Sequence, residues 1–126
     1  MAIVGIGTDL VEIKRIEKVL VAHPDRFPQR ILAEEELAVF REHLLPLHFL
    51  AKRFAAKEAG AKALGTGIRR NICFTDFVVS NGADGNPIMQ LTGCAAEQMQ
   101  KIGGRTVHLS LTDERNFAQA FVIIES

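Results

Sequence analysis

The alternation of apolar and polar positions at the start of the chain predicts a β-strand over residues 2–9. One face of this strand carries two glycines and ends at Asp9, so a backbone or a ligand has room to approach it closely. A helical period then runs from Val11 to about Ala22. Asp9 therefore stands at a predicted strand–helix junction, where its spacing to Glu12 is also typical of a helix N-cap.

The stretch 23–32 is interrupted by prolines and is expected to be irregular. A short helix with acids in its first turn is predicted over residues 33–43, as the helix dipole favours. A long helix is predicted to open at Pro46 and to end near Leu64, where the sequence GTG follows.

In the second half of the chain the period changes to that of strands. Strands are predicted over 72–80 and 87–91, followed by a helix over 92–103 and a terminal hairpin of strands 106–114 and 116–125. The order of elements is α+β, with a mostly antiparallel sheet packed on the long helix.

Length and composition fit one domain over residues 1–126, since domains cluster near ~100–150 residues. An apolar content of 48% provides a core and is slightly rich for a small monomer, which indicates apolar surface buried between subunits. Cys73 and Cys94 are far apart and form neither a disulfide framework nor a zinc motif. With no signal peptide and no stretch long and apolar enough for a membrane, we expect a cytoplasmic protein.

Charge is balanced overall but unevenly placed. The segment from Lys52 to Arg70 carries six basic residues against the single acid Glu58. Such a segment indicates a local anion site, although a solvated basic helix face is the commoner explanation. Nucleic-acid binding is weakly supported, because the net charge is zero and no aromatic platform is evident.

The long helix carries an acid and a base where its apolar stripe should continue. At ~100° per residue, Glu58 falls about 40° and Lys62 about 80° from Phe54. An exposed pair at this spacing would stabilise the helix by ~0.2–0.5 kcal/mol. At the edge of a core stripe, however, charges are costly to bury without a function. We therefore favour a functional role for Glu58 and Lys62.

The sequences GIGTDLVEI at 5–13 and RFAAKEAGAKALGTGI at 53–68 together resemble holo-acyl-carrier-protein synthases, the small single-domain branch of the 4′-phosphopantetheinyl transferases. The family signature is Gly-x-Asp followed by Phe-x-x-Lys-Glu-Ala-x-x-Lys. The matching positions here are Gly7, Asp9, Phe54, Lys57, Glu58, Ala59 and Lys62. The resemblance covers the whole chain, including the HLSLT strand and the closing IIES.

This resemblance implies a cytoplasmic enzyme of fatty acid biosynthesis that moves 4′-phosphopantetheine from coenzyme A to a serine of apo-acyl carrier protein. The serine attacks the β-phosphate and 3′,5′-ADP leaves, a displacement that needs charge neutralised on the phosphate oxygens. Carried over, Asp9 and Glu58 hold Mg²⁺ and Lys62 contacts the phosphate. The general base stays open among Glu58, a metal-bound water and the phosphate of the coenzyme.

The resemblance also implies a cofactor site formed by Arg53, Lys62, Gly65, Gly67 and His108, with Arg53 and His108 near the adenosine 3′-phosphate. Two positions depart from the family pattern. Val11 stands where larger relatives have a third acid, and Asp113 with Glu114 replace a second His of many small members, so that role is not transferred.

The family further implies a homotrimer with sites between subunits, and we expect His108 to act on the site of the neighbouring chain. Because acyl carrier proteins are strongly acidic, we expect them to dock on a basic surface that comprises Lys14, Arg15, Lys18 and Arg26. The main alternative is a non-catalytic binder of coenzyme A or a nucleotide, which would have no Mg²⁺ requirement. The set of Asp9, Glu58 and Lys62 argues against it.

Overall fold

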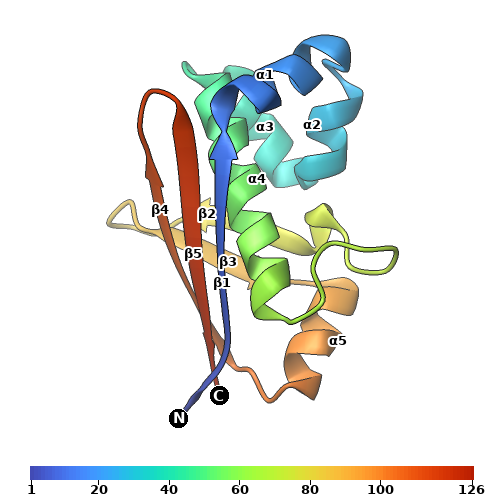
Figure 1. Cartoon of the computed structure of the whole chain (residues 1–126), viewed down its shortest axis with the longest axis vertical. Helices are drawn as coiled ribbons and strands as arrows, with labels where there is room; N and C mark the ends of the chain where they lie inside the picture. Colours follow the sequence, from blue (N-terminus) through green and yellow to red (C-terminus); the bar gives the residue numbers. More distant parts are fainter.

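The computed structural model describes all residues from 1 to 126 and has an α+β architecture, as predicted. A three-stranded antiparallel sheet in the order β1–β5–β4 packs one face on the long helix α4, and a separate two-stranded sheet pairs β2 with β3. Figure 1 shows α4 running behind β1, with the short helices gathered at one end and α5 at the other. The two chain ends meet where Ala2 N–H donates to Ser126 Oγ at 2.9 Å.

The elements have the following bounds. The strands are β1 (Ile3–Glu12), β2 (Phe77–Asn81), β3 (Pro87–Leu91), β4 (Thr106–Asp113) and β5 (Phe117–Glu125). The helices are α1 (Ile13–Ala22), α2 (Arg26–Ile31), α3 (Glu34–Glu42), α4 (Pro46–Ala63) and α5 (Gly93–Lys101), with a 3₁₀ turn at Phe74–Asp76.

The predictions for α3, α4, α5 and the terminal hairpin are confirmed to within a few residues. Pro46 opens α4, where the missing N–H of proline breaks no helical hydrogen bond. The loop that follows α4 has two residues with positive φ, Gly65 and Gly67, a conformation that favours glycine.

Three predictions are wrong, and each has a physical reason. The first strand extends to Glu12 because its ladder with β5 continues through the Val11–Ala118 pair, so Asp9 is no helix N-cap. The stretch 23–32 contains α2, where Pro28 sits in the first turn and loses no helical bond. In the segment 72–76, Ile72 is buried in an isolated bridge with Arg69 and Phe74 is buried at the start of the 3₁₀ turn, so β2 begins only at residue 77.

The predicted close approach to the glycine face of β1 is confirmed. A Cβ atom at Gly7 would lie 2.1 Å from the carbonyl oxygen of Ala59, and one at Gly5 would lie 2.1 Å from that of Ala63. Only glycine therefore allows β1 to lie against the backbone of α4. The opposite face of the sheet is uncovered in the single chain and carries large apolar side chains, among them Ile6 (60% exposed), Leu10 (62%) and Phe121 (40%).

Candidate active site

Asp9 lies in the interior of β1, opposite Ala120 of the central strand β5. Its side chain is on the same face as Gly5 and Gly7 and is largely buried. Because those glycines bring β1 against α4, the carboxylate of Asp9 reaches the helix directly. The strand thus supplies an acid at a fixed position beside α4.

From the side of α4, Lys62 meets this acid. Lys62 Nζ donates to Asp9 Oδ1 at 3.0 Å and to the carbonyl oxygen of Thr8, also at 3.0 Å. The side chain of Lys62 remains 50% exposed, so its ammonium group also faces solvent. Glu58 lies one helical turn before Lys62 and is half-buried. We call Asp9, Glu58 and Lys62 the cleft cluster.

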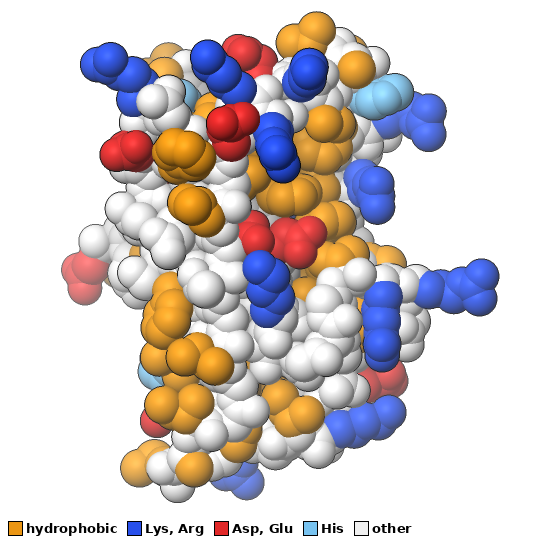
Figure 2. Space-filling view, viewed as in Figure 1, with side chains coloured by type: hydrophobic (Ala, Val, Ile, Leu, Met, Phe, Trp, Pro, Cys, Tyr) orange, Lys and Arg blue, Asp and Glu red, His pale blue; other side chains and the backbone are white.

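The cleft cluster lies in a cleft of about 670 Å³ between β1, α1 and α4. Its other walls are mostly apolar and include Val11, Ile16, Val19, Phe27, Phe54 and Phe117, with Glu12 and Arg15 at the charged end. Figure 2 shows acidic and basic side chains together in the middle of this face, bordered by hydrophobic side chains. The cleft thus combines an apolar wall with a few convergent charges, as ligand sites commonly do.

The charges of the cleft cluster do not balance. Burial raises the pKa of the Glu58 carboxyl above its usual value, the nearby charge of Asp9 raises it further, and Lys62 offsets part of the increase. Two acids therefore share one half-exposed base. A cation placed between them would offset the repulsion between the two carboxylates, which is the smaller of the two causes that raise the pKa of Glu58.

The donor set fits a hard cation such as Mg²⁺, which prefers carboxylate oxygens and keeps several of its own waters. The chain has no group of three or more His, Cys, Asp or Glu side chains arranged for a metal. Asp9 and Glu58 supply two carboxylates, and the position two residues after Asp9, where a further acid would stand, holds the apolar Val11, which lines the cleft.

The predicted cofactor residues do not all reach this cleft. Gly65 and Gly67 follow α4 directly and have open space at their Cα atoms, so a ligand can approach their backbone. His108 lies on the uncovered face of the sheet, where its Nε2 is 2.6 Å from Glu125 Oε1. It lies on edge strand β4, and β5 separates it from β1.

Arg53 points into the protein instead. It is buried, its guanidinium lies 4.5 Å from the ring centroid of Phe49, and it does not line the cleft. Its Nε lies 3.5 Å from Glu36 Oε2, and no acceptor forms a hydrogen bond with Nε. A phosphate would therefore have to displace this packing to reach Arg53.

Sequence analysis missed a second charged group, formed by Glu36, Arg53 and Lys57, which we call the interior cluster. Lys57 is 0% exposed, and its Nζ donates to Glu36 Oε1 at 2.5 Å and to the carbonyl oxygen of Ile31 at 2.6 Å. Burial lowers the pKa of Lys57, and Glu36 opposes that decrease. No local pattern signals this pair, because its members are 21 residues apart.

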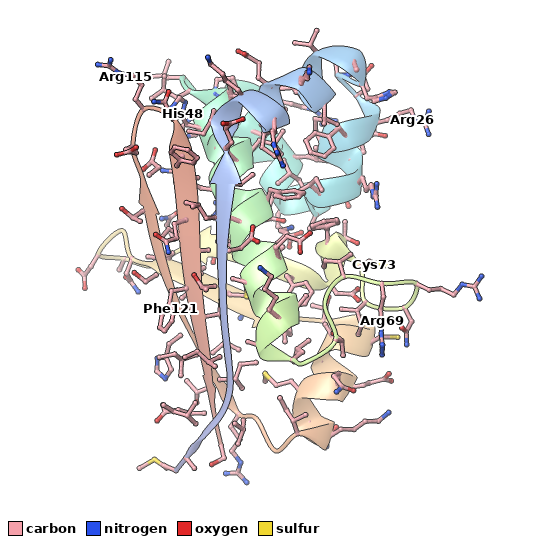
Figure 3. All side chains as sticks on the ribbon, viewed as in Figure 1. Arg26, His48, Arg69, Cys73, Arg115 and Phe121 are labelled. Carbon is pink, nitrogen blue, oxygen red and sulfur yellow. The ribbon has the colours of Figure 1, made fainter.

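The basic segment from Lys52 to Arg70 is consequently not one surface. Lys57 and Arg53 point inward to Glu36, Lys62 contacts Asp9, and Lys52 Nζ lies 3.8 Å from Asp113 Oδ1. The expected local anion site is thus restricted to Lys62 and the loop after it. The proposed docking residues Lys14, Arg15, Lys18 and Arg26 are all exposed, and Figure 3 shows Arg26 extending away from the sheet.

No helix combines the length and the apolar character that crossing a membrane requires. Both cysteines are free, as expected, with Cys73 exposed.

Comparison with known proteins supplies independent findings. The family model of the 4′-phosphopantetheinyl transferase superfamily matches residues 5–122. The holo-[acyl-carrier-protein] synthase of Vibrio parahaemolyticus is 52% identical over 126 residues, which is the full length of both chains. The crystal structure of holo-[acyl-carrier-protein] synthase from Neisseria meningitidis has a TM-score of 0.93 and 41% identity, covering 99% of this chain and 100% of that chain.

A third relative was crystallised with a ligand. The holo-(acyl-carrier-protein) synthase from Bacillus anthracis, in complex with CoA (3′,5′-ADP), has a TM-score of 0.82 and 41% identity, covering 98% of this chain and 97% of that chain.

Proposed function

This chain belongs to the 4′-phosphopantetheinyl transferase superfamily and is an enzyme of that family, and we propose that it transfers the 4′-phosphopantetheine group of coenzyme A to a serine of apo-acyl carrier protein. One observation carries the proposal. Lys62 Nζ donates a hydrogen bond to Asp9 Oδ1 at 3.0 Å in the wall of a largely apolar cleft, although the two residues are 53 positions apart in the sequence. The full-length similarity to holo-[acyl-carrier-protein] synthases supports this substrate pair.

In the proposed reaction, Asp9 and Glu58 would hold Mg²⁺. When bound, this ion neutralises charge on the phosphate oxygens. Lys62 turns its ammonium group to the same phosphate, which its 50% exposure and its place at the rim of the cleft allow. Preorganised positive groups of this kind stabilise the charge that develops in phosphoryl transfer.

The serine proton needs an acceptor within the cleft. The candidate acceptors there are the carboxylate of Glu58, a water in the cleft and a phosphate oxygen of coenzyme A. The carrier serine then attacks the β-phosphate, the phosphoanhydride bond breaks, and 3′,5′-ADP leaves with the electron pair of that bond.

For coenzyme A we propose a path from Lys62 along the loop at Gly65 and Gly67. The open space at these two glycines supports a close approach of the coenzyme to the backbone of this loop. The Bacillus anthracis relative, which was crystallised with CoA (3′,5′-ADP), supports the choice of co-substrate. Arg53 and His108 remain predicted contacts of the adenosine 3′-phosphate.

The proposed assembly is a homotrimer with each site at a subunit interface. The uncovered sheet face supports it, because Ile6, Leu10 and Phe121 expose apolar area there, and Figure 3 shows Phe121 on the side of the sheet away from α4. His108 lies on this same face, where a neighbour would bring it to another cleft. Glu58→Ala and His108→Ala subunits, each nearly inactive, should regain partial activity when mixed; no rescue despite proven exchange would contradict this assembly.

We propose that apo-acyl carrier protein docks on the surface formed by Lys14, Arg15, Lys18 and Arg26. We also propose that the reaction takes place in the cytoplasm. The exposure of all four residues supports this surface, and Arg15 also lines the cleft, so a docked carrier would have its serine near the cleft cluster.

The test is to incubate the protein with coenzyme A, Mg²⁺ and apo-acyl carrier protein and to weigh the carrier by mass spectrometry. A gain of ~340 Da, one phosphopantetheine arm, is the expected result. No mass gain, together with tight binding of coenzyme A, would instead identify a non-catalytic binder.

A further inference from the structure

The side of α4 that packs against β1 and β5 carries small side chains. Its buried residues there are alanines, Ala55, Ala56, Ala59 and Ala63, and Gly5 and Gly7 of β1 lie against the backbone at Ala63 and Ala59. Small side chains interlock little with their neighbours, so they define the rotation of a helix about its own axis weakly. The close contact of Gly7 with the Ala59 carbonyl limits how near β1 and α4 can come to each other.

The interior cluster supplies the directional contacts that this surface lacks. Glu36 Oε1 accepts from Ala33 N–H at 2.9 Å and from Lys57, and Glu36 Oε2 accepts from Val79 N–H of β2 at 3.1 Å. Lys57 also donates to Ile31 at the end of α2. One ion pair thereby ties α4 to α2, to the start of α3 and to β2.

A buried ion pair is weak evidence for stability, because well-packed apolar residues of similar size often serve equally well. What charges and hydrogen bonds add is a fixed direction. Lys57 and Glu58 are adjacent, about 100° apart around the helix. Whatever fixes Lys57 therefore also fixes the direction in which Glu58 leaves the helix.

The rotation of α4 matters for the cleft cluster. With side chains the helix has a radius of about 5–6 Å, so a rotation of about 20° would move the tip of Glu58 by roughly 2 Å. Misplacement of a reacting group by about 1 Å can lower a rate about 10²-fold. Asp9 would not follow this movement, because it belongs to β1 and not to α4.

We propose that Glu36 and Lys57 are a positioning pair, which sets the rotation of α4 and thereby places Glu58 and Lys62 opposite Asp9. The proposal rests on the proposed transferase function and extends it to residues that touch neither substrate. The wild-type enzyme tests that function by itself, since it must transfer the phosphopantetheine arm whatever the variants do.

The experiment compares the double variant Glu36→Gln/Lys57→Met, which removes the pair and keeps its shape, with Leu50→Ala. Leu50 is fully buried in α4, so its truncation weakens the fold while both charged side chains of the pair remain. Thermal unfolding, kcat, KM for carrier and Mn²⁺ binding by electron paramagnetic resonance without substrate are measured for each. Mn²⁺ binding reports on the cleft cluster independently of turnover.

We expect the double variant to fold, with kcat at least tenfold lower, Mn²⁺ half-saturation at least fivefold higher and KM for carrier within twofold of wild type. Leu50→Ala should unfold at a lower temperature but keep both kcat and Mn²⁺ affinity. A folded double variant with kcat and Mn²⁺ affinity within twofold of wild type overturns the proposal. If the double variant does not fold, Glu36→Asp decides, since it keeps the charge and retracts the carboxylate by one methylene. Unchanged kcat and Mn²⁺ affinity in Glu36→Asp overturn the proposal equally.

Discussion

Helix α4 contributes residues to two charged clusters, which contain the same types of residue but differ in how their carboxylates are neutralised. In the interior cluster, the two oxygens of Glu36 accept from two backbone N–H groups and from Lys57, with Arg53 also at ion-pair distance. In the cleft cluster, Asp9 and Glu58 share only the half-exposed Lys62, and the pKa of Glu58 is raised. Lys57 belongs to the interior cluster, and the adjacent Glu58 belongs to the cleft cluster.

The difference indicates how a structural charge is told from a functional one. A buried carboxylate whose donors are all supplied by the protein has no need of a ligand. Two acids facing one base leave an electrostatic deficit that a bound cation corrects. We therefore assign a structural role to the interior cluster and a chemical role to the cleft cluster, and the predictions below test this distinction.

The largest expected effect is on turnover. Asp9→Ala and Glu58→Ala should each lower the rate of phosphopantetheine transfer by on the order of 10³-fold, because they remove preorganised charge at the phosphate. Circular dichroism should stay close to wild type, since neither acid caps a helix or fills the core. Activity that persists in the presence of a chelator would contradict the role of the metal.

The second effect concerns stability. Lys57→Met alone leaves Glu36 buried beside Arg53 only, and removal of one partner from a buried ion pair costs about 3–5 kcal/mol of unfolding free energy. Urea denaturation measures this loss. Lys62→Met removes the corresponding base from the cleft cluster and should cost far less, since that side chain is half-exposed. Equal losses in the two variants would erase the distinction between the clusters.

The third effect has the opposite sign. Because the folded pKa of Glu58 lies above its unfolded value, the folded protein binds more protons than the unfolded chain between those two values. The unfolding free energy of the metal-free protein therefore falls as the pH rises through this window. Glu58→Gln removes this destabilisation. At pH values above the folded pKa of Glu58, the variant should therefore have a higher Tm than wild type, although it should transfer no phosphopantetheine.

Below the unfolded pKa of a glutamate, about 4.3, the advantage of Glu58→Gln should disappear. Glu17→Gln, on the exposed side of α1, is the matched control and should show no such pH dependence. A Glu58→Gln protein less stable than wild type at neutral pH would mean that Glu58 is satisfied in the fold.

The smallest effect lies at the edge of the cleft. Arg15→Glu should raise KM for the carrier several-fold and flatten its dependence on salt, while KM for coenzyme A stays unchanged. Lys101→Glu, exposed on α5 at the other end of the molecule, is the control and should change neither constant. Equal changes in both KM values for Arg15→Glu would indicate general destabilisation.

The sequence predicted the regular elements well where their signals are local. The helical period after Pro46 and the alternation of the terminal hairpin are properties of neighbouring residues. The N-cap alternative for Asp9 is wrong because the ladder of β1 with β5 is set by residues more than a hundred positions away. Local propensity cannot weigh such pairing.

The candidate site was reached by resemblance more than by periodicity. Helical spacing identified Glu58 and Lys62 as misplaced charges, but only the family signature joined them to Asp9. Glu36 was taken for an ordinary first-turn acid, and Arg53 for a cofactor contact, because their burial depends on the packing of three helices and β2. Burial of this kind has no sequence period.

The most direct test of the central claim is Mn²⁺ binding, measured by electron paramagnetic resonance in the presence of coenzyme A. The account predicts one Mn²⁺ per chain for the wild type, loss of that binding in Asp9→Asn and Glu58→Gln, and persistence of a bound ion, at weaker affinity, in Glu36→Gln. Absence of binding in the wild type, or binding that survives unchanged in both Asp9→Asn and Glu58→Gln, would contradict it.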